Sequence, residues 1–317
     1  MGITKKSLLS LTTIFGLMAV VGCAQLSPKS DLASKAIGQE LAASQLAAAQ
    51  ASGLTKKTVD IKGYTAHFYE GGESNEPTLV LLHGLVDNKN SFVPAVSELT
   101  KKYHVVLPDL QAHGDNAQVN ERDHSIEGQA AFIRDLVEKL GIKSLYIGGN
   151  SMGGHTAAAF AYRYQSMVKG LIVLNGTGVW LDKPSTYYPF PEEVDGPFMK
   201  EMWGSILINP PQLPDAAWNF LATDFQAKSP FYNQVVVQIE NSLDFRLDEK
   251  LATVKVPALI IWGSEDKIVP LYHGKGYHAK LPNSEFKVLN AGHGPQLDIP
   301  DVVQDEIAQF LKKQSVL

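Results

Sequence analysis

The sequence predicts an α/β fold in which a mostly parallel central sheet is flanked by helices. The first observation is a series of short, continuous apolar runs, typical of strands buried on both faces. These runs cover residues 78–84, 103–110, 144–150, 170–176 and 258–263. The second is the amphipathic, helix-like character of segments between or after them, such as Ile126–Leu140 and Val302–Lys313. Alternating strands and helices form a parallel sheet, and function gathers at the carboxyl ends of its strands.

One long segment breaks this alternation, because residues 177–255 contain no apolar run of comparable strength. Within it, residues 178–250 hold 12 of the chain's 28 aromatic residues, so we expect an inserted helical cap over the sheet rather than a polar linker. Most of its large aromatic side chains should pack between cap helices, and a minority should face a substrate. The six side chains in question are Trp180, Phe198, Trp203, Trp218, Phe220 and Phe225.

Composition limits the class of protein. The 317 residues are 44% hydrophobic and 19% charged, as in a soluble globular protein, and their number suits one large α/β domain or two ordinary ones. The formal net charge is -5, with no basic block after the N-terminal segment. Nucleic acid is therefore not expected as a partner, since phosphate binding needs clustered Lys and Arg.

The N-terminus has the features of a secretory signal. Lys5 and Lys6 precede an apolar run, Leu8–Gly22, that is short for a membrane span. The run ends in "VVGC", which looks like a bacterial lipobox and implies a signal peptide over residues 1–22 and lipidation at Cys23. An ordinary cleaved signal with an incidental cysteine is the alternative. Ala24, where some lipoproteins carry an inner-membrane-retaining Asp, favours the outer membrane.

Cys23 is the only cysteine of the chain, so intrachain disulfides are excluded. Within residues 23–56, the stretch Ser27–Leu54 is rich in Ala, Gln and Ser and favours a helix. We interpret this segment as a lipid-anchored spacer; a helix packed on the domain is the alternative. The globular domain should then span residues 57–317.

The stretch "GGNSMGG" could be a phosphate loop, a plain tight turn or the position of a reactive serine. A phosphate loop would require a Lys after the glycines, and none is present. Gly149, Ser151 and Gly153 instead match G-x-S-x-G, between a strand and a helix-like segment. That context is the one required by a nucleophile elbow, where a sharp turn leaves no room for a Cβ beside the serine. Ser151 is therefore the candidate nucleophile.

A serine hydroxyl needs a base, and the base needs a carboxylate that orients it. His293 follows the strand-like "EFKVLN" and precedes the last helix, the place expected for the base. Asp266 in "GSEDKIVP" lies just past a predicted strand and is the candidate acid, in preference to its neighbour Glu265. The spacing between Ser151 and Asp266 is wide, and the inserted cap accounts for it.

The backbone N–H groups of Leu85 and Met152 are the candidate oxyanion hole, since "HGL" ends an early strand and Met152 follows the serine. His83 should order this loop rather than act as a base. The His, Asp and Glu residues lack the spacing of metal ligands, so we expect neither a metal nor a cofactor.

The motifs "HG", "PDL", "GNSMGG", "WGSEDKIVP" and "GHG" together resemble the α/β-hydrolase superfamily across residues 57–315. The lipobox, the elbow and "PPQLP" at residues 210–214 are similar to those of bacterial lipoprotein lipases and esterases related to monoacylglycerol lipases. The resemblance implies hydrolysis of acyl esters through an acyl-enzyme, with Ser151, Asp266 and His293 as the triad. The chain departs from the common P-D-L-x-G-x-G-x-S at Ala112 and Asn116.

Hydrolases that cleave carbon–carbon bonds of ring-cleavage diketo acids resemble the chain in the same motifs and are the alternative. Their anionic substrates favour a basic pocket, whereas the predicted cap holds one Arg, Arg246. An aromatic residue typically follows their catalytic His, whereas Gly294 follows His293 here. Haloalkane dehalogenases and epoxide hydrolases would need Asp at position 151.

Overall fold

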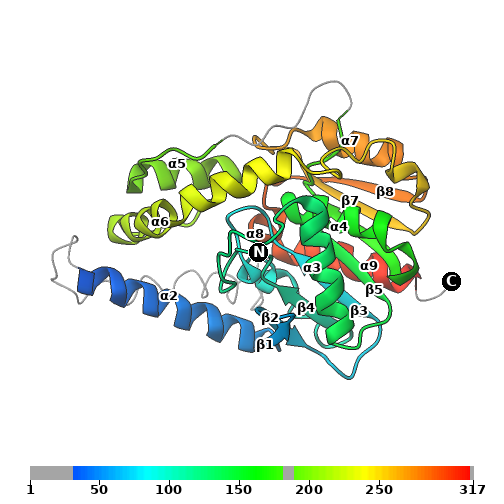
Figure 1. Cartoon of the computed structure of the whole chain (residues 1–317), viewed down its shortest axis with the longest axis horizontal. Helices are drawn as coiled ribbons and strands as arrows, with labels where there is room; N and C mark the ends of the chain where they lie inside the picture. The colour runs from blue at the N-terminus through cyan, green and yellow to red at the C-terminus, as the bar shows by residue number, and fades with distance from the viewer. Residues whose placement is uncertain (1–30, 181–188, 315–317) are drawn as a thin grey trace, which may run out of the picture.

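The computed structural model describes residues 31–180 and 189–314. Its centre is an eight-stranded sheet with the order β1-β2-β4-β3-β5-β6-β7-β8 (Figure 1). The strands are β1 Thr55–Ile61, β2 Tyr64–Gly71, β3 Thr78–Leu82, β4 His104–Pro108, β5 Leu145–Asn150, β6 Val168–Leu174, β7 Ala258–Gly263 and β8 Ser284–Leu289. Strands β3 to β8 pair in parallel, and β1 and β2 pair antiparallel. The predicted mostly parallel sheet is confirmed.

The sequence pattern did not indicate the β1–β2 hairpin as a separate element. Its first strand begins at Thr55, inside the segment interpreted as a spacer. β1 lies at the edge of the sheet, and only Ile61 at its end is fully buried. An edge strand with so few buried residues lacks the continuous apolar run that marks the inner strands.

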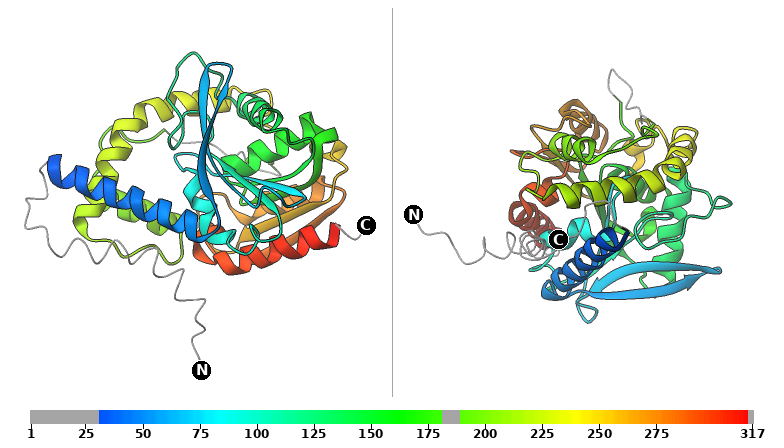
Figure 2. Two further views of the ribbon diagram at one scale, coloured as in Figure 1. Left: turned by 90° about the horizontal axis from the view of Figure 1, so that it is seen from below. Right: turned by 90° about the vertical axis from the view of Figure 1, so that its left-hand side faces the viewer.

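Helices cover both faces of the sheet (Figure 2, left). One face carries α3 Ile126–Lys139, α4 Met152–Arg163 and α7 Leu271–Lys280; the other carries the 3₁₀ helix η2 Lys89–Ala95, α8 Pro295–Asp298 and α9 Pro300–Gln314. Strand β7 shows the division, because Ile260 and Trp262 belong to the first core and Leu259 and Ile261 to the second. Successive strand residues point to opposite faces, so a doubly buried strand is apolar throughout.

Between β6 and β7 the described residues contain helices and no strand. These helices are α5 Gly196–Ile206, α6 Asp215–Glu240 and the short η4 Leu251–Thr253; a further 3₁₀ helix, η3 Gln165–Met167, precedes β6. The side chain of Asp195 accepts a hydrogen bond from the Phe198 N–H at 2.8 Å and so caps α5. Helices α5 and α6 share a small apolar core of their own, centred on Trp218.

The aromatic side chains expected in the cap occupy three environments, and two of these side chains, Trp203 and Phe225, take part in both the cap core and the cavity wall. Trp218 and Phe225 are buried in the cap core, with Phe198 and Trp203 packed against it. Trp203, Phe220 and Phe225 line the large cavity described below. Trp180 lies elsewhere, with its ring 5.2 Å from that of Phe245.

The N-terminal helix α2, Asp31–Ala51, runs along the same side of the molecule as α5 and α6 (Figures 1 and 2). Its C-terminal part packs on the domain, where Ala49 is fully buried and the Gln45 side chain accepts a hydrogen bond from Asn90. Near its start, a Cβ at Gly38 would lie 2.9 Å from the Phe220 ring of α6. Helix α2 is therefore a packed helix rather than a free spacer.

No helix in the described part of the chain has the length and apolar character needed to cross a bilayer. The predicted signal segment, residues 1–22, and Cys23 lie outside the described residues.

The packing of α2 can be tested with two neighbouring alanines. Ala49→Arg would force a long charged side chain into a fully buried position, whereas Ala47 is exposed on the same helix. We expect Ala49→Arg to lower the free energy of unfolding by about 2 kcal/mol or more and Ala47→Arg to change it by less than about 0.5 kcal/mol. Urea unfolding measures both, and equal effects would contradict the packed arrangement.

Candidate active site

Ser151 lies at the sharp turn between β5 and α4. Its backbone has φ 56° and ψ −122°, a conformation that non-glycine residues rarely adopt. The flanking glycines allow the surrounding backbone to close on this turn: a Cβ at Gly149 would lie 2.4 Å from the carbonyl carbon of Gly153, and one at Gly153 would lie 2.2 Å from Leu82 O. The strand–turn–helix context predicted for Ser151 is thus present.

His293 and Asp266 meet at the carboxyl edge of the sheet. Asp266 Oδ2 lies 2.9 Å from Nδ1 of His293, and both side chains are buried. The other carboxylate oxygen of Asp266 accepts the N–H groups of Ile268 and Val269, each at 2.8 Å. The carboxylate is therefore fixed, and the imidazole keeps Nε2, on the far side of its ring, as the atom that can accept a proton.

Asn175 also belongs to the site, although the sequence motifs did not single it out. It follows β6 with φ 47°, and its Nδ2 donates to Asp266 Oδ2 at 2.5 Å. Its Oδ1 accepts the N–H of Gly263 at the end of β7. Asn175 therefore holds the carboxylate against the strand that precedes it. The available signal was a polar residue at the end of a strand, in "LIVLNG".

Asn150, the residue before Ser151 in the elbow motif, also holds the site together. Its Nδ2 donates to His293 O at 2.8 Å and to Leu174 O at 3.2 Å. The residue before Ser151 thus ties the elbow to the backbone of the imidazole-bearing loop. This fixes the relative position of Ser151 and His293.

The two candidate oxyanion donors flank Ser151. A Cβ at Gly84 would lie 3.3 Å from Ser151 Cβ, so the backbone that leads to Leu85 passes directly beside the serine. Met152 is the first residue of α4, where N–H groups have no carbonyl of their own helix to bond. The helix N-terminus also favours negative charge at this point.

His83 is fully buried and uses both ring nitrogens in the loop. Nδ1 donates to Gly84 O at 2.8 Å, and Nε2 accepts the Leu110 N–H at 2.9 Å. Burial lowers its pKa to about 3, so the ring stays neutral. The expectation that His83 orders this loop is confirmed.

A buried ion pair fixes the segment that follows Leu85. Lys89 Nζ lies 2.6 Å from Asp109 Oδ2 and 2.6 Å from Asp115 Oδ2, and Asp109 is fully buried. Asn116, one of the departures from the superfamily pattern, donates to the Asp109 and Leu110 carbonyls. These contacts connect the loop after β4 to the loop after β3.

His155 ties the elbow helix to the chain that leaves the cap. It is fully buried, and its Nε2 lies 2.7 Å from Asp244 O. A Cβ at Gly178 would lie 2.5 Å from the His155 ring, so this glycine permits the close contact. Burial lowers the pKa of His155 to about 4.

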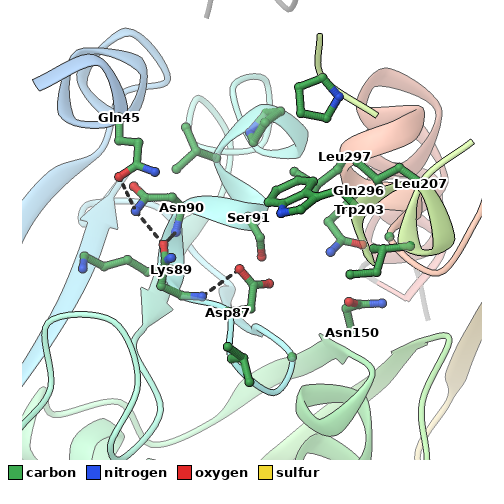
Figure 3. Close-up of a pocket in the computed structure, with 18 of the residues that line it drawn as sticks. Gln45, Asp87, Lys89, Asn90, Ser91, Asn150, Trp203, Leu207, Gln296 and Leu297 are labelled. Atoms are coloured by element: carbon green, nitrogen blue, oxygen red, sulfur yellow. Dashed lines mark hydrogen bonds between the residues drawn. The ribbon is translucent and has the colours of Figure 1, made fainter. Parts of the chain in front are cut away.

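A cavity of about 1940 Å³ lies above Ser151 and His293, enclosed by α2, η2, α5 and α6. Much of its wall is apolar, and Figure 3 shows Trp203 and Leu207 on one side of it. Other apolar lining residues are Leu41, Met199, Met202 and Leu221. Such a cleft suits a substrate with a long apolar part.

Within the described ranges, no group of three or more His, Cys, Asp or Glu side chains is placed to hold a metal ion.

The sequence model of the alpha/beta hydrolase family matches residues 79–306. The chain therefore belongs to this family. A monoacylglycerol lipase from Mus musculus is 28% identical over 269 residues, which cover 77% of this chain and 78% of that protein. This relative supports an ester hydrolase.

Two solved structures illustrate how widely the fold is shared. A membrane phospholipase A, described as a bacterial virulence factor, has a TM-score of 0.82 at 24% identity and covers 98% of this chain and 99% of its own. A meta-cleavage product hydrolase from Pseudomonas fluorescens IP01 has a TM-score of 0.71 at 21% identity and covers 81% and 97%. At these identities the likeness establishes the fold alone.

We expect stability to fall as the pH drops below about 6.5, because buried imidazoles stay neutral in the folded protein. Burial lowers the pKa of His113 to about 3, as it does for His83, and that of His155 to about 4, from an ordinary value of 6.5. Between these values the unfolded chain binds more protons, so acid favours unfolding. Asp87 acts in the opposite direction, since burial raises its pKa to about 6.

Three imidazoles outweigh one carboxyl group, which leaves a slope of about 2–3 kcal/mol per pH unit near pH 5. Urea unfolding at a series of pH values measures this slope. A free energy of unfolding that is constant or rises as the pH is lowered toward about 4.5 would contradict the prediction.

Proposed function

We propose that this member of the alpha/beta hydrolase family hydrolyses carboxylic esters with Ser151 as nucleophile, His293 as base and Asp266 as the carboxylate that orients it. One observation carries the proposal. The strained Ser151 turn and His293, whose ring is held by Asp266, line the same largely apolar cleft. Asn150 links the two parts directly.

The proposed reaction proceeds in two steps. Ser151 Oγ attacks the ester carbonyl while His293 Nε2 takes its proton, and Asp266 stabilises the resulting imidazolium. The N–H groups of Leu85 and Met152 bind the oxyanion. The tetrahedral intermediate expels the alcohol, which receives the proton from His293. Water, activated by the same imidazole, then releases the acid and frees Ser151.

The shape and chemistry of the cleft favour a lipid or another ester with an apolar acyl group. Side chains from α5 and α6, such as Met202 and Trp203, form an apolar wall. An acyl chain has only apolar surface, so an apolar wall is the kind of surface that binds it. The monoacylglycerol lipase relative supports acylglycerols as the substrate class.

Carbon–carbon bond hydrolysis of diketo acids is the second candidate, because a meta-cleavage product hydrolase shares the fold. The charges in the cleft disfavour it. No arginine lines the described cavity, and three of its four lining lysines, Lys56, Lys89 and Lys228, are paired with carboxylates. The fourth, Lys267, is exposed. The carboxyl group of Asp87 lines the same cavity and would repel an anionic substrate.

Replacement of Ser151 tests the proposal. We expect Ser151→Ala to reduce kcat for a series of p-nitrophenyl esters by about 10⁴-fold or more, because no other group supplies the nucleophile. Ser166→Ala, which alters an exposed serine in η3, is the matched control and should retain the wild-type rate. Near-normal hydrolysis by Ser151→Ala would contradict the proposal. Turnover of a ring-cleavage diketo acid without ester hydrolysis would favour the second candidate.

We also propose that the protein is a lipoprotein anchored through Cys23, with outer-membrane location favoured by Ala24. Residues 24–30 separate the cysteine from the start of α2, and seven extended residues span at most about 25 Å. Helix α2 lines the cleft at Ile37 and Gly38. The proposed anchor would therefore hold the cleft close to the membrane.

The anchor proposal predicts that Cys23→Ser moves the protein from the membrane fraction to the soluble fraction. The thiol is the acylation site, so incorporation of labelled fatty acid should be lost as well. Unchanged membrane association after the substitution would count against the lipobox. The alternative of an incidental cysteine predicts that neither measurement changes.

A further inference from the structure

A polar cluster interrupts the apolar lining of the cleft near Ser151. It consists of Asp87 and Ser91, from the segment after β3, and Gln296, from α8. Helix α8 packs against η2, which brings the two segments together. Figure 3 shows the ends of these three side chains directed toward one hollow, with Asn150 beside them. None of the three has a role in the proposed triad or oxyanion hole.

Gln296 is the clearest sign that this hollow receives a ligand. The residue is 1% exposed, and its Oε1 has no hydrogen-bond partner among the described residues. A buried amide oxygen without a partner costs about 1–3 kcal/mol. That cost is removed when a hydroxyl group of a bound molecule donates to it.

Ser91 and Asp87 complete the hollow. Ser91 is 5% exposed, and its hydroxyl faces the Asp87 carboxyl group. A serine hydroxyl that donates to a carboxylate can still accept a hydrogen bond from a ligand. Asp87 Oδ1 accepts the Asn88 N–H at 2.7 Å, which orients the carboxyl group within the cleft. A carboxylate, an amide and a hydroxyl together can accept from and donate to more than one hydroxyl group.

The charge around the cluster selects the kind of ligand. The nearest cation in sequence, Lys89, is held by Asp109 and Asp115 rather than by Asp87. An anionic headgroup such as a phosphate would therefore meet the Asp87 carboxylate next to a lysine that two other carboxylates already hold. A neutral hydroxylated group meets only complementary donors and acceptors.

We infer that Asp87, Ser91 and Gln296 form a subsite for the hydroxyl groups of the alcohol part of the ester, so that the preferred substrates are esters of neutral polyols such as glycerol. The inference rests on the proposed ester hydrolysis at Ser151. The apolar wall at Met202 and Trp203 then receives the acyl chain. The two parts of the substrate lie on opposite sides of the scissile bond.

Three soluble butyrate esters with three-carbon alcohols test the inference: glycerol monobutyrate, propyl butyrate and the phosphate monoester of glycerol monobutyrate. The first two differ only in the hydroxyl groups of the alcohol. For the wild-type protein we expect kcat/KM for glycerol monobutyrate to exceed that for propyl butyrate about tenfold or more. The phosphate-bearing ester should be the slower of the two glycerol esters.

Two variants assign the preference to the subsite. Asp87→Asn removes the charge and keeps an oxygen for the Asn88 N–H, and Gln296→Met removes both polar atoms at similar length. Each should lower the ratio of the two kcat/KM values severalfold toward one. Asp60→Asn in the β1–β2 hairpin and Gln50→Met on the exposed side of α2 are matched controls that should keep the wild-type ratio.

The outcomes separate the two proposals. Hydrolysis of neither neutral ester by the wild-type protein would contradict the proposed function itself. Hydrolysis with a wild-type ratio near one, or with a ratio that both variants leave unchanged, would overturn the subsite and leave the proposed function standing. Faster turnover of the phosphate-bearing ester would overturn the preference for neutral alcohols.

Discussion

The turn at Ser151 is the constraint on which the rest of the site depends. A φ of 56° at a residue with a side chain is unfavourable, and the surrounding packing must maintain it. Gly149 and Gly153 let β3, β5 and α4 approach until a Cβ would collide with backbone atoms. The Ser151 N–H donates to Leu174 O, which anchors the turn to β6. Exposure of the serine at the carboxyl edge of the sheet follows from this close packing.

Two asparagines extend this constraint to the other side chains of the site. Asn150 joins the elbow to the backbone of His293, and Asn175 joins the end of β6 to Asp266 and to β7. The loops after β7 and β8 are therefore positioned by asparagine side chains at the carboxyl ends of β5 and β6. Amide side chains can both donate and accept, so one residue can join two strand ends without adding charge to the site.

The cleft combines elements that lie far apart in the sequence. Helix α2 precedes the sheet and α5 and α6 are inserted between β6 and β7, yet all three border one cavity. Much of its apolar wall comes from the cap, and α2 adds Ile37 and Leu41, whereas Asp87, Ser91 and Gln296 come from segments at the sheet edge. The helices that cover the cleft therefore supply most of its apolar surface, and the segments that carry Ser151 and its neighbours supply the polar cluster.

The sequence by itself determined the inner strands, the helices between them and the location of Ser151, because doubly buried strands and the elbow impose local patterns of residues. It indicated Asp266 and His293 through their positions after strands. Only the tertiary structure decided that α2 packs on the domain and that β1 and β2 form an edge hairpin, because such partly exposed segments carry weak apolar patterns. The tasks of Asn150, Asn175 and Gln296 also depend on contacts between distant loops, which no local pattern encodes.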